Sequence, residues 1–140
     1  MKPEDTLDFN IRWTWLNISR YYNDAAANYG ENMSVGMVLL NIDKEHGTPS
    51  TQLGPNMGME PTSLSRTLKN MEDSGLIKRK ADKTDGRKAI VHITAKGAKK
   101  REVAKAIVLE FNNNIMSQIS EEETQTFIKV LNTINEQIKE

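Results

Sequence analysis

The 140-residue sequence predicts a mainly α-helical fold with one small β-hairpin. Apolar residues recur every three or four positions over long segments at both ends of the chain, as one face of a helix requires. The spacing changes to strand-like alternation over residues 76–93. Gly and Pro residues divide the segment between the first helix and this hairpin, so the helices there are expected to be shorter.

The first two helices are predicted from apolar spacing and from residues that end helices. Over residues 5–28, the apolar side chains that share one helical face are Leu7, Ile11, Trp15, Ile18, Tyr22 and Ala25. Gly30 interrupts this helix. A second helix is expected to begin at Ser34, as its N-cap, and to stop at Gly47.

The third and fourth helices begin at Pro residues. Thr48 and Pro49 are expected to cap and start the third helix, which Gly54 and Pro55 keep short. The fourth is expected to begin at Pro61 and to be closed by Gly75 at C′, and its apolar stripe consists of Leu64, Leu68 and Met71. The side chains on its other side are small, polar or basic: Thr62, Ser63, Arg66, Lys69 and Asn70. The fourth helix is therefore expected to pack one face and leave the other free.

Residues 76–81 and 88–93 are predicted to form the two strands of the hairpin. Asp85-Gly86 is a two-residue turn signal, and the connection DKTDGR makes the tip polar and basic. Thr94 is then expected to cap a long helix. Ser120 and Glu123 have the spacing of a capping box, which predicts one last helix after them.

Charge is distributed unevenly along a chain whose formal net charge is zero. Residues 61–100 contain 11 Lys and Arg but 4 Asp and Glu, a net charge of +7, whereas residues 1–60 and 101–140 carry −4 and −3. A basic block between acidic flanks is typical of a segment that contacts a polyanion. The alternative is a Lys-rich surface that is only solvated.

The order of the elements predicts a winged helix-turn-helix with long N- and C-terminal helices. The major groove of DNA admits one helix, and short polar side chains and Arg read the base edges there. The free face of the fourth helix meets this requirement. The alternative is that Arg66 and Lys69 belong to an ordinary solvated face.

The hairpin is the expected wing. Arg87 at its tip can enter the adjacent minor groove, while Arg79 and Lys80 can contact phosphates. The alternative is that Arg87 is a turn residue paired with Asp82 or Asp85.

The run PTSLSRTLKNMEDSGLIKRKADKTDGRKAIVHITAKG, residues 61–97, resembles the MarR family of bacterial transcriptional regulators. Asp85-Gly86-Arg87 is similar to the D-x-R of that family's wing, and residues 93–97, ITAKG, are similar to its L-T-x-K-G. The resemblance implies that Ser63, Ser65 and Arg66 lie on the DNA-reading helix. It also implies that Arg87 enters the minor groove and that Asp85 orients it. One departure is Gly54-Pro55, where the family usually has a regular helix.

The resemblance further implies a homodimer in which the first and the last two helices intertwine. The residues agree, because these helices exceed what the central lobe needs to close its own core, and long apolar stripes usually bury against a partner. The chain is thus expected to be one domain over residues 1–140, with a DNA-binding lobe over 33–97 and dimerisation helices over 1–30 and 98–140. A two-fold dimer predicts a pseudo-palindromic operator with half-sites on the order of 10 bp apart.

The expected DNA-binding residues are Thr62, Ser63, Ser65, Arg66, Lys69, Asn70, Arg79, Lys80, Asp85, Arg87 and Lys88. Many members of the family release DNA when a small, often aromatic, acid binds. The residues expected to line such a site are Trp13, Trp15, Tyr21, Tyr22 and Met37. The alternative is that these side chains only pack, as aromatic and Met side chains at helical spacing usually do.

Several classes of function are excluded or disfavoured by composition. The absence of cysteine excludes Cys-zinc sites, thiol nucleophiles and thiol redox switches. His46 beside Asp43 and Glu45 matches no metal-site spacing, and no catalytic constellation is present, so we expect no metal, no cofactor and no enzyme. Without a membrane span or a signal peptide, the expected location is the cytoplasm.

The leading hypothesis is a homodimeric, sequence-specific DNA-binding regulator, a repressor that a small ligand releases. The alternative is a winged-helix module whose basic hairpin docks an acidic protein partner without reading bases. Salt response and sequence dependence of DNA binding distinguish the two.

Overall fold

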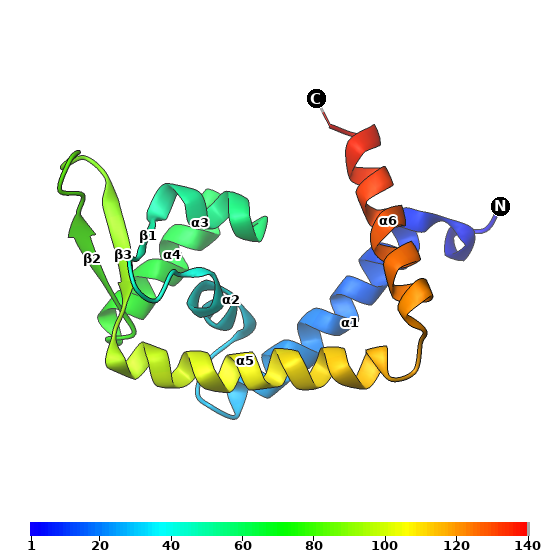
Figure 1. The fold of residues 1–140 in the computed structure, drawn as a ribbon, viewed down its shortest axis with the longest axis horizontal. Coiled ribbons are helices and arrows are strands. Elements are labelled where there is room, and N and C mark those ends of the chain that lie inside the picture. The colour runs from blue at the N-terminus through cyan, green and yellow to red at the C-terminus, as the bar shows by residue number, and fades with distance from the viewer. Residues whose placement is uncertain (140) are drawn as a thin grey trace. The chain divides into compact units, whose positions relative to one another are not determined.

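The computed structural model describes residues 1–139, and over these residues the chain forms six α-helices, one short 3-10 helix and three β-strands (Figure 1). In chain order the elements are η1 (Pro3–Asp5), α1 (Leu7–Ala27), α2 (Met33–Asn41), β1 (Thr48–Pro49), α3 (Ser50–Met57), α4 (Pro61–Asp73), β2 (Ile77–Ala81), β3 (Ala89–Ile93), α5 (Ala95–Met116) and α6 (Glu121–Gln137). The predicted mainly α-helical fold with one hairpin is confirmed. The chain divides into two compact units, Met1–Lys105 and a second unit that begins at Ala106.

The hydrophobic core of the first unit lies between α2, α3, α4 and the sheet. Its buried members are Val35, Val38, Leu39, Ile42, Leu53, Leu64, Leu68, Met71, Leu76, Ile77 and Val91. The stripe predicted on the fourth helix, Leu64, Leu68 and Met71, is buried as expected. Since a fully buried side chain of this size contributes about 1.5–3 kcal/mol to folding, the stripe holds α4 firmly against the lobe.

The three strands form an antiparallel sheet in the order β1-β3-β2. Val91 in the central strand pairs with Thr48 on one side and with Arg79 on the other. The prediction that Thr48 and Pro49 cap and start a helix is therefore wrong, because they form an edge strand. Pro49 is tolerated there because an edge strand has one unpaired side. Helix α3 begins one residue later and, as predicted, is short.

Helix α2 begins and ends earlier than its sequence predicts. Its N-cap is Asn32 and not Ser34, because the Asn32 side chain accepts a hydrogen bond of 3.0 Å from the Val35 N–H. It ends at Asn41, since the next residue, Ile42, is extended and buried in the core. Gly47, at a φ of 74°, closes the turn that follows rather than the helix.

The Asp43 carboxylate organises that turn. Its Oδ1 accepts hydrogen bonds from the backbone N–H groups of Glu45, at 2.9 Å, and His46, at 3.0 Å. These bonds, with the one from His46 the larger contribution, lower the pKa of Asp43.

The hairpin is confirmed, but its turn is not the predicted one. The Lys88 N–H donates to the Asp85 carbonyl at 3.0 Å, so Gly86 and Arg87 are the central residues instead of Asp85 and Gly86. Gly86 is not among the glycines with a positive φ, which a type I′ turn at that position requires. The connection between the strands therefore spans residues 82–88, a longer loop than a two-residue hairpin has.

Both C-terminal helices begin at the predicted caps. The Gly97 N–H donates to the Thr94 hydroxyl at 3.1 Å at the start of α5. At the start of α6, the Glu123 N–H donates to the Ser120 hydroxyl at 3.0 Å, and the Ser120 N–H donates to the Glu123 carboxylate at 2.9 Å. No helix within residues 1–139 is long and apolar enough to cross a membrane.

Candidate nucleic-acid interface

Helix α4 presents a continuous polar face to solvent. The exposed side chains are Thr62, Ser63, Ser65, Arg66, Lys69 and Asn70, and all of them except Ser65 were predicted from helical spacing to lie on the free face. Arg66 forms no ion pair with any residue that the structure describes, and the Lys69 Nζ lies 4.0 Å from the Asp73 carboxylate. Pro61 occupies the first turn, which contains no acidic residue. The face is therefore a row of hydrogen-bonding and cationic groups without a competing carboxylate in its first turn.

The β2–β3 hairpin is the basic wing. Four of the five residues of β2 are exposed, among them Lys78, Arg79 and Lys80, whereas Val91 on the paired strand is buried. The Arg79 Nε lies 3.6 Å from the Glu72 carboxylate on α4. This ion pair ties the wing to α4 and leaves Arg79 less free than the neighbouring lysines.

Arg87 lies at the wing tip with 93% of its side chain exposed. Its backbone N–H and its Nε donate to Asp85 Oδ1 at 3.1 and 3.3 Å. The sequence left Asp82 and Asp85 as alternative partners of Arg87. In the structure, Arg87 contacts Asp85. The guanidinium keeps its other donors for a ligand.

The other carboxylate at the tip, Asp82, is occupied by Thr84. The backbone N–H and the hydroxyl of Thr84 both donate to Asp82 Oδ1 at 3.0 Å. These two hydrogen bonds lower the pKa of Asp82, and the one from the Thr84 backbone N–H contributes most. The loop therefore holds an ionised carboxylate beside the tip.

Two lysines of the basic block have partners within the protein, which the sequence does not indicate. The Lys96 Nζ donates to the Ser74 carbonyl at 2.8 Å. Lys100 forms a half-buried ion pair with Glu31, in the loop between α1 and α2. Their partners are 22 and 69 residues away in the chain, so no local pattern indicates them.

The aromatic residues expected to line a ligand site lie on α1, and three of them, Trp13, Trp15 and Tyr21, are exposed. The rings of Tyr21 and Tyr22 meet edge to face with centroids 5.6 Å apart. Burial, and then the neighbouring Tyr21, raise the pKa of Tyr22. Met37 is half-buried on α2. The ligand role of these residues stays a prediction.

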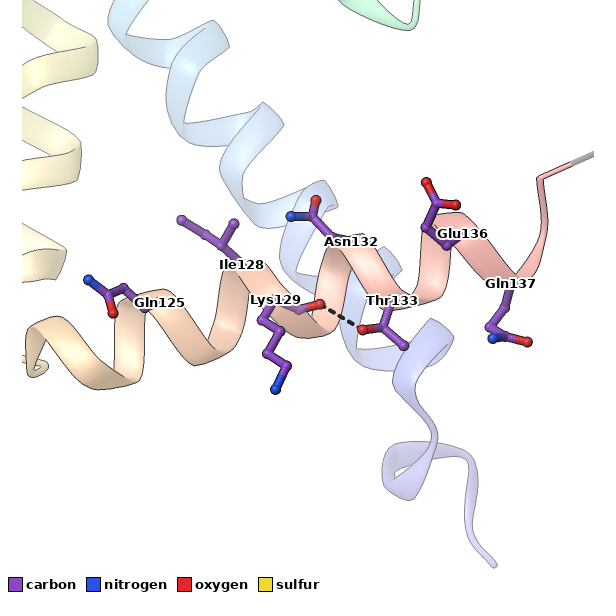
Figure 2. Close-up of a pocket in the computed structure, with 7 residues that line it drawn as sticks. All are labelled: Gln125, Ile128, Lys129, Asn132, Thr133, Glu136 and Gln137. Atoms are coloured by element: carbon purple, nitrogen blue, oxygen red, sulfur yellow. Dashed lines mark hydrogen bonds between the residues drawn. The ribbon is translucent and has the colours of Figure 1, made fainter.

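A shallow hollow elsewhere in the molecule lies along α6 (Figure 2). It is lined by Gln125, Ile128, Lys129, Asn132, Thr133, Glu136 and Gln137. These residues follow helical spacing on one side of the helix, and Phe127, Leu131 and Ile134 fall on the other. The hollow is thus the space between side chains on the polar face of one amphipathic helix.

The His46 ring lies 3.7 Å from the Asp43 carboxylate and 4.0 Å from that of Glu45, and all three side chains are mostly exposed. Within residues 1–139, no group of three His, Cys, Asp or Glu side chains is placed to hold a metal ion.

Comparison with known proteins shows which proteins the chain is similar to in sequence and in fold. The sequence profile of the MarR family matches residues 32–89, which include α2, the helix-turn-helix and most of the wing. The HTH-type transcriptional regulator BilQ of Clostridium symbiosum is 26% identical over 103 residues, 72% of each chain.

Solved structures extend the similarity of fold to almost the whole chain. The Staphylococcus aureus MepR–DNA complex has a TM-score of 0.87 at 21% identity and covers 95% of this chain and 98% of its own. PcaV from Streptomyces coelicolor, in complex with its natural ligand, has a TM-score of 0.83 at 14% identity. The match covers 97% of this chain and 96% of the PcaV chain. CouR from Rhodococcus jostii, bound to p-coumaroyl-CoA, has a TM-score of 0.83 at 21% identity. The match covers 96% of this chain and 94% of the CouR chain.

BilQ and PcaV are described as transcriptional regulators, in agreement with the expectation from the sequence. The matching profile spans the candidate interface from α2 through the wing tip, and the matching folds include the long helices on either side. Residues 32–89 of the chain thus match the MarR family of transcriptional regulators, and the chain has the winged helix-turn-helix fold of the solved structures to which it is similar.

Proposed function

We propose that this protein is a homodimeric repressor that acts in the cytoplasm and binds a pseudo-palindromic operator. The observation that carries the proposal is the pairing, within one compact unit, of an uncovered polar face on α4 with a basic wing joined to it by the Arg79–Glu72 ion pair. A helix of this kind fits the major groove, and a basic hairpin beside it reaches the flanking minor groove. The DNA complex of MepR, which has the same fold, supports the proposal.

The proposed contacts divide into base reading and backbone binding. On α4, the side chains proposed to read base edges are Thr62, Ser63, Ser65, Arg66, Lys69 and Asn70. On the wing, Arg79, Lys80 and Lys88 bind phosphates. Arg87 enters the minor groove, and its hydrogen bond to Asp85 orients its side chain. Phosphate contacts supply affinity and register, while base contacts supply sequence preference.

The dimer is proposed from the apolar side chains that each long helix exposes. These include Trp13 and Trp15 on α1, Leu109 and Ile115 on α5, and Phe127 on α6. Large exposed apolar surface in a soluble chain usually marks an interaction site. A second copy that covers these helices would present two copies of α4 to successive turns of DNA, with half-sites about 10 bp apart.

A small aromatic or acidic ligand is proposed to release the repressor from DNA. The residues proposed to bind it are Trp13, Trp15, Tyr21, Tyr22 and Met37. Two proteins of the same fold, PcaV and CouR, were solved with a natural ligand and with p-coumaroyl-CoA.

The test is a fluorescence-anisotropy titration of labelled DNA from upstream of the protein's own gene, with a scrambled fragment as the control, at about 150 mM salt. The expected result is tight binding to a short inverted repeat that excess unrelated DNA does not displace. Weak binding that unrelated DNA abolishes would overturn the proposal and favour docking of an acidic protein partner.

A further inference from the structure

The segment that leaves α4 is held by the start of α5. Three successive backbone carbonyls, those of Ser74, Gly75 and Leu76, each accept a hydrogen bond from Thr94 or Lys96. The Lys96 Nζ donates to Ser74 at 2.8 Å, the Thr94 hydroxyl to Gly75 at 2.6 Å and the Thr94 N–H to Leu76 at 3.1 Å. The chain after α4 therefore has its polar backbone groups satisfied by one short segment.

Gly97 brings this segment into direct contact with the backbone. A Cβ atom at Gly97 would lie 2.1 Å from the Leu76 carbonyl oxygen and 2.9 Å from an Ile93 side-chain carbon. Both distances are too short for real atoms, so only glycine permits this approach. We call Thr94, Lys96 and Gly97, together with the carbonyls of residues 74–76, the exit clamp.

Lys96 also supplies a charge that α4 lacks. The C-terminal end of a helix carries a partial negative charge, which a cation stabilises. The last turn of α4 contains no basic residue, so the cation that donates to a backbone carbonyl at that end, Lys96, comes from α5. Arg101, five residues further along α5, donates in the same way to the Leu39 carbonyl in the last turn of α2.

We propose that the exit clamp is the link that transmits the direction of α5 to α4, and that Lys96 positions α4 for DNA reading instead of contacting phosphate. The proposal rests on the proposed function, in which α4 reads the operator. Any change in α5 that a second copy or a ligand imposes would then reach α4 through the hydrogen bonds to residues 74–76.

The test compares Lys96→Met with Lys99→Met. Lys99 is an exposed lysine on the same helix with no ion pair among the described residues, so both variants lose one positive charge from α5. Without DNA, Lys96→Met is expected to accelerate amide hydrogen exchange over residues 70–76, while Lys99→Met leaves it unchanged. Lys96→Arg, which keeps the charge and the donor, is expected to restore protection.

With operator DNA, Lys96→Met is expected to lower affinity about tenfold, as the loss of one charge-assisted hydrogen bond would. The slope of log affinity against log salt should stay that of wild type, because no phosphate contact is lost. A slope that becomes shallower by about 0.9 would make Lys96 a phosphate contact and overturn the proposal. Unchanged exchange over residues 70–76 would also overturn it.

The two readouts separate this inference from the proposed function. A wild-type protein that prefers no DNA sequence overturns the proposed function and the role of Lys96 in DNA reading. The amide exchange rates are measured on the protein without DNA. They therefore show whether the exit clamp holds α4 even if the protein prefers no DNA sequence. Because Lys96 is exposed, its substitution leaves the core intact, which the thermal unfolding of both variants checks.

Discussion

Arg66 and Arg87 are both exposed, but the protein restrains them differently. Arg66 has no carboxylate partner in the described structure, whereas the Arg87 side chain donates one hydrogen bond, from Nε, to the Asp85 carboxylate at 3.3 Å. A side chain that is already oriented loses less conformational entropy on binding. The Arg87 side chain is therefore partly oriented before DNA binds, while the Arg66 side chain takes up its orientation at the base edge that it contacts.

Replacing Arg66 with Ala is expected to lower affinity for the operator relative to scrambled DNA by about 1–3 kcal/mol, because a bidentate contact to a base is lost. The measurement is anisotropy titration with both DNA fragments. Arg12→Ala, which removes an exposed arginine of α1, is the matched control. An equal loss on both fragments would show that Arg66 contacts phosphate and reads no base.

Replacing Arg87 with Ala is expected to weaken binding to operator and scrambled DNA alike. The slope of log affinity against log salt should become shallower by about 0.9, since a cation that releases one counterion when it enters the minor groove is removed. Titrations at four salt concentrations measure this slope, again with Arg12→Ala as the control. If the slope does not change, the wing tip lies outside the interface.

Single side chains were predictable where the signal is local. The free face of α4 follows from helical spacing, and the Asp85–Arg87 contact joins residues two positions apart. The roles of Lys96 and Lys100 were not predictable, because their partners lie in distant segments and both lysines count as ordinary members of a basic block. A charge count alone therefore overstates how many cations face a ligand.

The junction between the wing and α5 is expected to be the most sensitive to an added methyl group. Gly97→Ala places a Cβ against the Leu76 carbonyl and should lower the free energy of unfolding by about 3 kcal/mol. Gly86→Ala is the control, because it meets open space at a φ that Ala accepts. That change should stabilise the protein by about 0.4–1 kcal/mol. Urea unfolding at one protein concentration compares the two, and similar values would contradict the close approach at Gly97.

The start of α6 depends on its capping box. Ser120→Ala is expected to cost about 1 kcal/mol of stability, because the Glu123 N–H loses its acceptor. Hydrogen bonds from the backbone N–H and then the hydroxyl of Ser120 hold the pKa of Glu123 below its usual 4.5. The stabilisation from the ionised carboxylate is therefore complete above pH 4.5 and is lost as the pH falls through the lower folded pKa.

Thermal unfolding of wild type and Ser120→Ala between pH 3 and pH 7 measures this effect, because the pH range spans the ordinary carboxyl pKa of about 4. The difference between the two proteins should narrow towards acid pH. A difference that is constant over the whole range would show that the Ser120 hydroxyl does not stabilise the ionised Glu123 carboxylate.

Boundaries of helices and strands were predictable where the cap is local and failed where a distant strand decides. The Thr94 cap and the Ser120–Glu123 box are formed by residues three positions apart, and both are present. Thr48 and Pro49 form a strand because they pair with residues 90 and 91, which no local signal reveals. Asn32 caps α2 in place of Ser34 because both residue types are good caps and tertiary packing selects the register.

The assembled molecule is expected to be a dimer in solution. Phe127 is 61% exposed on α6, and Gln125, on the polar face of the same helix, lines the hollow in Figure 2. Light scattering should give a mass about twice that of one chain. Phe127→Glu should shift the population towards monomer, while Gln125→Glu should not. A monomeric wild type, or equal effects of the two changes, would contradict burial of the apolar face of α6 in a dimer.

The fold class was predictable because helical spacing, a strand-like interval and their order along the chain all indicate one arrangement. The operator sequence and the ligand are properties of other molecules, so the spacing of residues in this chain does not predict them. The dimer is predicted from exposed stripes such as that of α1, which a one-dimensional pattern does not distinguish from an internal core until the structure shows them uncovered.

The open space around Gly86 makes the wing tip a natural place for a spectroscopic probe. The chain contains no cysteine, so Gly86→Cys would carry the sole thiol in the protein. A fluorophore or spin label attached there would be joined at one known position without any background mutation. Its rotational freedom would report in real time whether the tip is loose in solvent or trapped in a groove.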